Sequence, residues 1–432
     1  MNAKVAIVKG TIPLEMLKEA FHYFDDFHDK IRGKKIVIKP NFGAWSTILP
    51  RHTNEWVVTS KDVLMATIKL LRELGASTIT VAESAFIDTD MEKIYKDMGL
   101  KKAFRDLNID LVDLAKGPFK KVKVLNNTSV EIAELVLNAE CLINMPMLKT
   151  HGETTVSLGS KNLKGALSHQ SKRIFHRKGL SQAIAHLTSI IKPTINIVDG
   201  LIGLEGFGPV QTGTPIEVGV IIVGDNLIAT DVVAASIMGF NPEDILHLKL
   251  ANELGTGPLY LSDIEVVGES IDTVKVPFEP CPTGNEIYRH ALSLLGIPED
   301  QVSGNYTDHW CSMCMMNFMG PIWALRDDCG TKMREKLFVV ADQADLPESY
   351  EGKLILYGNC QARNKTKVKN DDFIFIKGCP PSQMKVYTTF GKILYSRKRF
   401  FWGLFKRLFK GNKLSWLPQW KEAITKNKEI NG

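Results

Sequence analysis

The feature that most constrains the fold is the regular alternation of strand-like and helix-like segments along the first 115 residues. Apolar, strand-like runs occur at residues 4–10, 34–43, 77–84 and 109–115. Amphipathic, helix-like runs separate them at residues 14–27, 61–75 and 90–108. Such alternation is typical of a parallel sheet covered by helices. The sequence therefore predicts an α/β fold of mostly parallel sheets with flanking helices.

The chain is long enough for more than one domain. Its 432 residues exceed what one hydrophobic core usually organises. The hydrophobic share of 44% and the charged share of 24% are those of a folded protein. The proline-rich stretch VPFEPCPTG predicts a connection near residue 282. We predict an N-terminal α/β domain, a central α/β domain with basic and glycine-rich loops, a smaller C-terminal α/β cysteine-containing domain and a basic aromatic tail, over residues 1–140, 141–281, 282–394 and 395–432.

The composition also restricts the cellular setting. The amino-terminal MNAKVAIVKG runs directly into a strand-like segment and lacks the pattern of an export signal. No window approaches the roughly 18 apolar residues that a membrane-spanning helix needs. The formal net charge of +6 is too small to indicate a nucleic-acid-binding protein. We expect a cytoplasmic protein whose seven cysteines are reduced thiols or metal ligands.

Four cysteines have the spacing of a metal site. Cys311 and Cys314 form a C-x-x-C pair, which lets two thiolates of one turn reach a common metal centre. Cys360 and Cys379 each follow an apolar strand-like run and a glycine. If those two strands are adjacent and parallel, both cysteine turns emerge at the same edge of the sheet. The sequence therefore predicts that these four thiolates converge on one metal group.

All-thiolate coordination suits either zinc or an iron–sulfur cluster. Structural zinc sites usually take their ligands in two close pairs, whereas the third and fourth cysteines here are single and far apart in sequence. Pro380 follows the last cysteine, as a proline does in bacterial ferredoxin motifs. We therefore predict one 4Fe-4S cluster, with zinc as the alternative. Cys329 could replace one of the four ligands, but its polar setting favours an idle thiol, and Cys141 and Cys281 are expected to be structural.

The segment 149–178 has the composition of an anion-binding site. It holds seven Lys or Arg and three His against one carboxylate. In its loop, Lys161, Asn162 and Lys164 are predicted to meet a phosphate or carboxylate together with exposed backbone amides. Ligands in open parallel sheets bind beyond the carboxyl ends of the strands, so Lys39 and Asn41, in the turn KPNFGAW, are predicted to join them. The alternative is a solvated basic surface.

The same region supplies the candidate catalytic residues, which include Lys149. His151 follows Lys149 in a loop, and His176 lies among basic residues whose charges favour a neutral imidazole able to act as a base. Asp199 and Glu205 lie in a glycine-rich stretch that can approach a ligand closely. Each of these two carboxylates is either a general base, a metal ligand or the cap of a turn.

Four motifs in order resemble a known family. VIKPNFG, LKTHGETTVSLGSKNLKG, IVDGLIGLEGFGP and DVVAASIMGFNPEDILHLKLA resemble the bacterial and archaeal family called domain of unknown function 362, over roughly residues 1–270. Many members resemble ferredoxins at one end and carry tandem 4Fe-4S motifs. This chain lacks the run C-x-x-C-x-x-C-x-x-x-C-P, so the resemblance implies one cluster at most. The family is distantly similar in its alternating fold to nickel-pincer lactate racemases. By that analogy His151 or His176 is an acid–base residue, and Lys161 or Lys164 contacts an anion or cofactor.

The tail has the pattern of a basic amphipathic helix. Phe401, Leu404, Phe405 and Leu408 recur at helical spacing, and seven basic residues and no acidic one occur over 397–413. With Trp402, Trp416 and Trp420 it is expected either to lie on an anionic membrane surface, peripheral to the inner face, or to pack on the protein.

Together these features favour an iron–sulfur redox enzyme or electron-transfer component of anaerobic metabolism. It would act with an anionic small molecule and a redox partner protein. The second hypothesis is a non-redox racemase or isomerase with a structural metal site. The third is a protein that carries a metal or cofactor to another enzyme.

Overall fold

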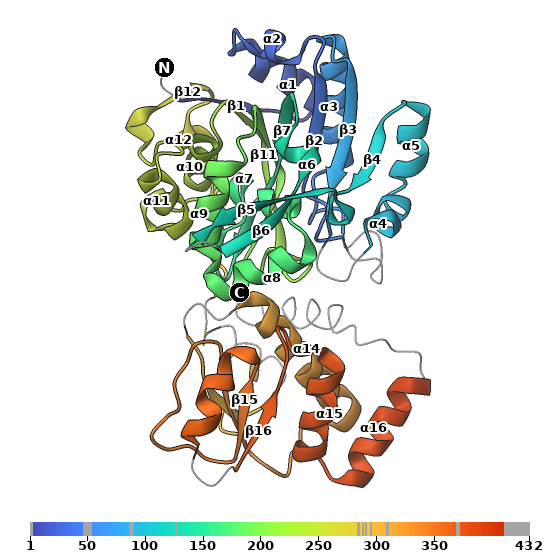
Figure 1. Ribbon diagram of the computed structural model, residues 1–432, viewed down its shortest axis with the longest axis vertical. Coiled ribbons are helices and arrows are strands. Elements are labelled where there is room, and N and C mark those ends of the chain that lie inside the picture. The colour runs from blue at the N-terminus through green and yellow to red at the C-terminus, as the bar shows by residue number, and fades with distance from the viewer. Residues whose placement is uncertain are drawn as a thin grey trace. The chain divides into compact units, whose positions relative to one another are not determined.

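The computed structural model describes residues 3–45, 54–85, 90–125, 128–282, 296–307, 311–368 and 372–409, together with positions 286, 289, 292 and 293. The chain forms two compact units, Met1–Cys281 and Pro282–Gly432. Figure 1 shows the elements of both units.

The first unit is built on one large sheet. Its main path runs in the order β12 (Ile264–Gly268), β1 (Ala3–Lys9), β11 (Thr214–Gly224), β10 (Ile195–Glu205), β7 (Cys141–Met145), β2 (Lys35–Pro40), β3 (Thr78–Glu83) and β4 (Asp110–Asp113). Neighbours on this path are parallel, except that β11 is antiparallel to both β1 and β10. The mostly parallel α/β fold is therefore confirmed.

Residue 140 does not separate two sheets. Strand β2 pairs in parallel with β7, from Ile36 opposite Cys141 to Pro40 opposite Met145, so β7 lies beside β2 in Figure 1. The expected domains 1–140 and 141–281 therefore share one sheet. Strand β10 also pairs with β8 (Met147–His151), which forms a short antiparallel pair with β9 (Thr155–Val156). A further hairpin, β5 (Phe119–Val124) with β6 (Thr128–Ala133), stands apart from this sheet.

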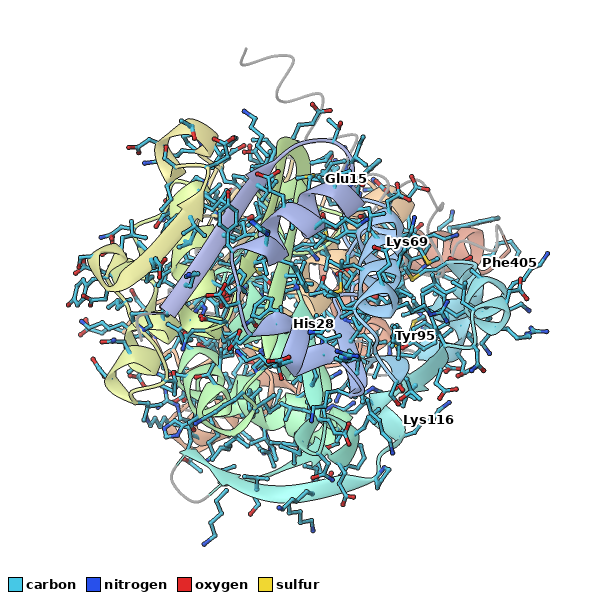
Figure 2. All side chains as sticks on the ribbon, turned by 90° about the horizontal axis from the view of Figure 1, so that it is seen from above. Glu15, His28, Lys69, Tyr95, Lys116 and Phe405 are labelled. Carbon is cyan, nitrogen blue, oxygen red and sulfur yellow. The ribbon has the colours of Figure 1, made fainter. Side chains whose placement is uncertain are left out.

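Apolar side chains cover both faces of the sheet. Along β1, Val5 and Ile7 belong to one buried cluster while Ala6 and Val8 belong to the other, because successive side chains of a strand point to opposite faces. One face is covered by α1 (Pro13–His22), α2 (Phe27–Ile31), α3 (Lys61–Glu73), α4 (Met91–Asp97) and α5 (Leu100–Asp106). Glu15, Lys69 and Tyr95 mark three of these helices in Figure 2.

The other face is covered by the helices that follow β9. They are α7 (Gly159–Asn162), α8 (His169–Lys178), α9 (Leu180–Ile190), α10 (Leu227–Ile237), α11 (Leu246–Glu253) and α12 (Ile271–Val274), and the short α6 (Glu134–Leu137) also packs here. Every residue of α10 is buried, which explains its nearly continuous apolar sequence. The single carboxylate inside α10 belongs to Asp231.

The second unit contains a smaller sheet of four parallel strands. In order they are β13 (Val302–Asn305), β14 (Leu337–Ala341), β15 (Lys353–Tyr357) and β16 (Phe373–Ile376). Its helices are α14 (Ser312–Cys329), α15 (Gln383–Leu394) and α16 (Arg397–Phe409). The ring of Phe318 on α14 packs edge-on against Tyr357 and Phe390, at 5.4 and 5.6 Å between ring centroids. These contacts join α14 to β15 and α15.

Helix α16 packs through a face other than the predicted stripe. Phe400 is 8% exposed, and its ring packs against the backbone of Gly391. Gly403 packs against the sulfur of Cys329. The side chains of Phe401, Trp402 and Phe405 are 66%, 55% and 40% exposed. The side chain of Leu408 and the residues from 410 onward, with Trp416 and Trp420, lie outside the described residues. Among the described helices, none is both long and apolar enough to cross a membrane.

Candidate functional site

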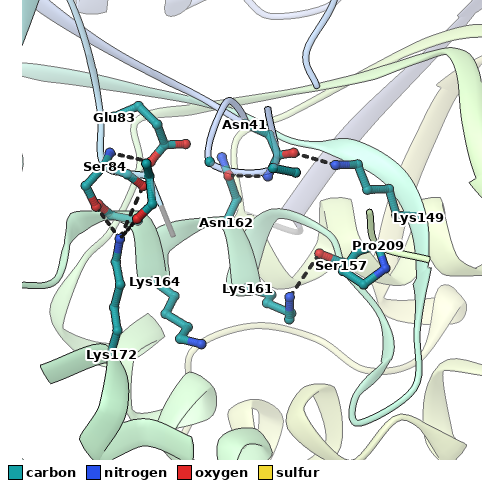
Figure 3. A pocket seen from close by; sticks show the side chains of 14 residues that line it. Asn41, Glu83, Ser84, Lys149, Ser157, Lys161, Asn162, Lys164, Lys172 and Pro209 are labelled. Atoms are coloured by element: carbon teal, nitrogen blue, oxygen red, sulfur yellow. Dashed lines mark hydrogen bonds between the residues drawn. The ribbon is translucent and has the colours of Figure 1, made fainter. Parts of the chain in front are cut away.

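A small pocket opens at the carboxyl ends of β2 and β3, where parallel sheets usually bind ligands (Figure 3). Its volume is about 90 Å³. It is lined by Asn41, Gly43, Ala44, Glu83, Ser84, Ala85, Lys149, Ser157, Lys161, Asn162, Lys164, Gly165, Lys172 and Pro209. The turns KPNFGAW and AESAFID both contribute to this lining. We call it the lysine pocket, after Lys149, Lys161, Lys164 and Lys172.

The carboxylate in the lysine pocket is already paired. Lys39 Nζ donates to both oxygens of Glu83 at 3.0 Å, and the two side chains are 0% and 2% exposed. Glu83 also accepts from the backbone N–H of Phe42 at 3.2 Å and of Ser84 at 2.8 Å. Burial lowers the pKa of Lys39, and the Glu83 charge opposes that shift. Lys39 therefore does not line the pocket but holds the Glu83 carboxylate that does.

Gly165 allows the turn Leu163–Ala166 to pass close to the Lys39–Glu83 ion pair. A Cβ added at Gly165 would collide with Glu83 Oε1 and would lie 2.6 Å from Lys39 Nζ. No side chain fits at that position without displacing the buried pair. The importance of Glu83 could have been suspected from its place at the end of a strand, but its pairing with Lys39 joins residues 44 apart in sequence.

The backbone amides predicted to meet a phosphate are occupied by a side chain. Asp231 accepts from the N–H groups of Gly159 and Ser160 at 2.7 and 2.8 Å. Burial raises the pKa of Asp231 to about 6. This corrects the expected loop of exposed amides. Sequence reasoning missed Asp231, although a lone carboxylate within the apolar run ATDVVAASI was a usable signal.

The amide of Asn162 is likewise committed to the protein. Its Oδ1 accepts from Lys39 Nζ at 3.2 Å and from Asn41 Nδ2 at 3.1 Å. Its Nδ2 donates to Asn144 Oδ1 at 2.8 Å. Asn162 and Asn41 therefore hold the loops of the pocket together, and the ammonium groups remain the main groups that can attract a ligand.

Two of the pocket lysines are held by neutral acceptors. Lys149 Nζ donates to Asn41 Oδ1 at 2.6 Å and to the carbonyl of Val57 at 2.5 Å. Lys172 Nζ donates to the carbonyl of Ala85 at 2.7 Å and to both the carbonyl and the hydroxyl of Ser84. Burial lowers the pKa of each lysine to about 7. Sequence reasoning did not single out Lys172, since a basic run does not reveal which lysine turns inward.

The other two pocket lysines differ from each other. Lys161 Nζ lies 3.3 Å from Ser157 Oγ. Burial and the charges of Lys164 and Lys149 lower the pKa of Lys161 well below its usual value. Lys164 Nζ contacts His176 Nε2, and His176 Nδ1 lies 3.3 Å from Glu153 Oε2.

His151 lies beside these lysines as a neutral imidazole. Its Nδ1 accepts from the backbone N–H of Glu153 at 3.0 Å and of Thr154 at 3.3 Å. Burial and the nearby positive charges of Lys161 and Lys164 lower the pKa of His151 well below its usual value. With Nδ1 accepting, the tautomer that fits carries its proton on Nε2. His151 is therefore arranged to donate a hydrogen bond, whereas the sequence suggested a base.

The two candidate carboxylates do not line the pocket. Asp199 accepts from the backbone N–H of Ser60 at 2.7 Å and of Leu201 at 3.3 Å, and burial raises its pKa. Glu205 accepts from the backbone N–H of Glu279 at 2.8 Å. Both carboxylates hold backbone segments, which is the capping alternative left open by the sequence.

In the second unit, the strand ends carrying two cysteines meet. Strands β15 and β16 pair in parallel up to Tyr357 opposite Ile376. Beyond them, Asn359 N donates to the carbonyl of Gly378 at 2.8 Å, and Gly378 N donates to Asn359 Oδ1 at 3.0 Å. The two strands are therefore adjacent and parallel, as the predicted convergence of their cysteine turns requires. Cys360 and Cys379 follow the two hydrogen-bonded turns at one edge of the sheet.

The C-x-x-C pair lies at the N-terminus of α14, near Cys360 and Cys379. Cys311 is the N-cap residue of α14, and Cys314 lies in its first turn. A hydrogen bond with Cys311, burial, and charge on Cys311, Cys360 and Cys379 raise the pKa of Cys314 well above its usual value. Burial, Asp342 and two of these cysteines raise the pKa of Cys360 to about 11. The four thiols, which we call the cysteine cluster, therefore lie close enough to repel one another as thiolates.

The chemistry of these four sulfur donors suits a metal group. Four sulfur ligands suit zinc or an iron–sulfur cluster, and bound cations would remove the repulsion between thiolates. The remaining cysteines lie elsewhere. Cys329 ends α14 about 22 Å along the helix axis from Cys314, at about 1.5 Å per residue. Burial raises the pKa of Cys141 to about 11 and of Cys281 to about 12.

Comparisons with known proteins add the following similarities. The chain is 24% identical over 232 residues to the thylakoid-associated protein sll1697 of Synechocystis, covering 52% of this chain and 70% of that protein. The lactate racemase apoprotein from Thermoanaerobacterium thermosaccharolyticum has a TM-score of 0.40 at 11% identity, over 89% of this chain and 79% of that one. A structural-genomics protein from Thermotoga maritima has a TM-score of 0.34 at 13% identity, over 85% and 97%.

The profile of the family described as "Domain of unknown function (DUF362)" matches residues 36–236. All the residues that line the lysine pocket fall within this span.

Proposed function

We propose that this chain is an iron–sulfur protein that holds one 4Fe-4S cluster and serves as a redox enzyme or electron-transfer component. The observation that carries the proposal is the hydrogen-bonded pair of turns that brings Cys360 and Cys379 to one sheet edge. Cys311 and Cys314 would complete the ligand set from the N-terminus of α14, whose partial positive charge favours thiolates. Such a cluster, when bound, supplies one-electron chemistry.

Metal analysis tests this proposal directly. Protein purified without oxygen should be brown, with broad visible absorption and with iron and sulfide in near-equal amounts. Colourless protein that contains only zinc would overturn the redox assignment. It would leave the cysteine cluster as a structural metal site.

We further propose that the lysine pocket binds a small anion. The Glu83 carboxylate is paired with Lys39, and the amines of Lys149 and Lys172 donate to neutral acceptors. Buried amines held by neutral acceptors favour an anionic ligand when they are protonated.

Anion affinity should fall as pH rises through 7. Burial lowers the pKa of Lys149 and Lys172 to about 7, so both are mostly charged at pH 6 and mostly neutral at pH 8. Sulfate is a suitable probe because its own charge is constant over this range. Loss of one charge between these pH values changes affinity by about 10-fold. Titration calorimetry should show at least this loss, and pH-independent binding would contradict the proposal.

A non-redox racemase or isomerase is the second candidate. Lysines with a pKa of about 7 can exchange protons at neutral pH, as general acid–base catalysis requires. This function would place all the chemistry in the lysine pocket. It predicts that protein containing zinc, or no metal, still turns over an anionic acid.

We propose that α16 touches an anionic membrane surface. Phe401, Trp402 and Phe405 are exposed on a helix whose sequence is basic, a combination that suits the interface of an anionic bilayer. The related Synechocystis protein is named for its association with thylakoids.

Replacing Phe401, Trp402 and Phe405 together with Ser should reduce cosedimentation with phosphatidylglycerol vesicles by more than about 10-fold, since each aromatic side chain contributes over 1 kcal/mol when buried. The matched control replaces Ile12 and Tyr260, which are 61% and 49% exposed in the first unit. Equal binding by both variants would exclude this contact.

A further inference from the structure

Lys161 and Lys164 line the same pocket but have different partners. Lys161 belongs to α7, and Lys164 to the 3-10 turn Leu163–Ala166 that follows it. Lys164 contacts His176, which is also in contact with Glu153. A carboxylate therefore supports the charge of Lys164 through the imidazole. Figure 3 shows both lysine side chains at the pocket.

Lys161 has no such support. Within the described part of the chain, its amine makes one hydrogen bond, to the Ser157 hydroxyl at 3.3 Å, and no ion pair. The charged groups around it are Lys164, Lys149 and Glu153, of which two are positive. An amine that is withdrawn from water beside other cations loses its proton easily.

The other two pocket amines are less suited to attack a ligand. Lys172 is surrounded by three oxygen acceptors, enough for all three hydrogens of an ammonium group. Lys149 donates to two acceptors. Lys161, with one weak hydrogen bond, is the pocket amine whose nitrogen is least committed to the protein.

We propose that Lys161 forms a reversible imine with a small anionic carbonyl compound, an oxo acid or a phosphorylated aldehyde or ketone, whose negative charge is bound by Lys164. The amine nitrogen bonds to the carbonyl carbon, and the carbon–oxygen bond then breaks. The oxygen leaves as water with the two amine hydrogens, so no oxidant or reductant is consumed. This inference rests on the anion binding proposed above and is independent of the cysteine cluster.

Trapping with glyoxylate, a small anionic aldehyde, tests the imine. The full-length protein is treated at pH 7 with glyoxylate and cyanoborohydride, and labelled lysines are located by peptide mass spectrometry. An ordinary lysine has roughly one neutral amine in 2,500 at this pH. We expect Lys161 to be labelled at least about 100-fold faster than the exposed Lys120 and Lys121.

Three variants and sulfate complete the test. Lys161→Arg should abolish the fast labelling and still bind sulfate, while Lys121→Arg should change neither. Sulfate should slow the labelling of Lys161, and Glu153→Gln should raise the sulfate concentration required. Labelling of Lys161 no faster than Lys121 in protein that binds sulfate overturns the imine and leaves the anion site standing. Absence of sulfate binding overturns both.

Discussion

Replacing Cys379 with Ser is expected to remove most of the iron from anaerobically purified protein. Cys379 follows the turn that is hydrogen-bonded to the turn before Cys360, so its loss deletes one of the four proposed ligands. Iron per chain should fall at least about 10-fold, because even changes outside the ligand shell of metal sites have effects of this size. The measurements are iron and sulfide content and the visible absorption band.

Cys329→Ala provides the matched control. This buried thiol lies at the far end of α14, with its sulfur against Gly403 of α16. The variant should keep its iron and its colour. Full iron in Cys379→Ser, or equal loss in Cys329→Ala, would contradict the assignment of the cysteine cluster as the ligand set.

Replacing Glu83 with Gln is expected to destabilise the first unit by about 3–5 kcal/mol, the usual cost of breaking a buried ion pair. The change leaves the fully buried Lys39 without its anion, while the N–H groups of Phe42 and Ser84 lose a charged acceptor. Thermal or urea unfolding, followed by a probe in the first unit, measures the loss.

The double variant Lys39→Met, Glu83→Gln isolates the contribution of charge. Without the Lys39 ammonium, the neutral amide at position 83 no longer faces an uncompensated cation, so the double variant should be more stable than Glu83→Gln. If the two variants unfold at the same temperature, the unpaired charge is not the source of the loss.

The fold could be predicted from local patterns because each parallel strand and its covering helix lie in one continuous segment. The position of the cysteine cluster followed in the same way, since Cys360 and Cys379 directly follow two strands that became neighbours. The division at residue 140 could not be read locally. The division depended on whether β2 pairs with β7, which lies about one hundred residues later in the chain. Pairing over such a distance leaves no periodic signal in the sequence.

The side-chain roles in the lysine pocket were harder to predict than its position. The basic composition of 149–178 indicated an anion site, yet it did not show that Asp231 would occupy the loop amides. It also did not show that Asn162 would be used to join loops. In the tail, helical spacing identified the apolar side chains correctly. The packed face was set instead by Gly403, whose small size permits close approach to α14.

The pairing of β2 with β7 also decides how this protein can be divided. The lysine pocket takes Glu83 and Asn41 from one side of residue 140 and all four of its lysines from the other. A fragment that ends at residue 140 would present β2 as an open edge, a surface that favours aggregation. The portion that matches the DUF362 profile therefore has to be produced with both halves of its sheet, and residues 1–281 are the natural unit for studying the pocket without the cysteine cluster.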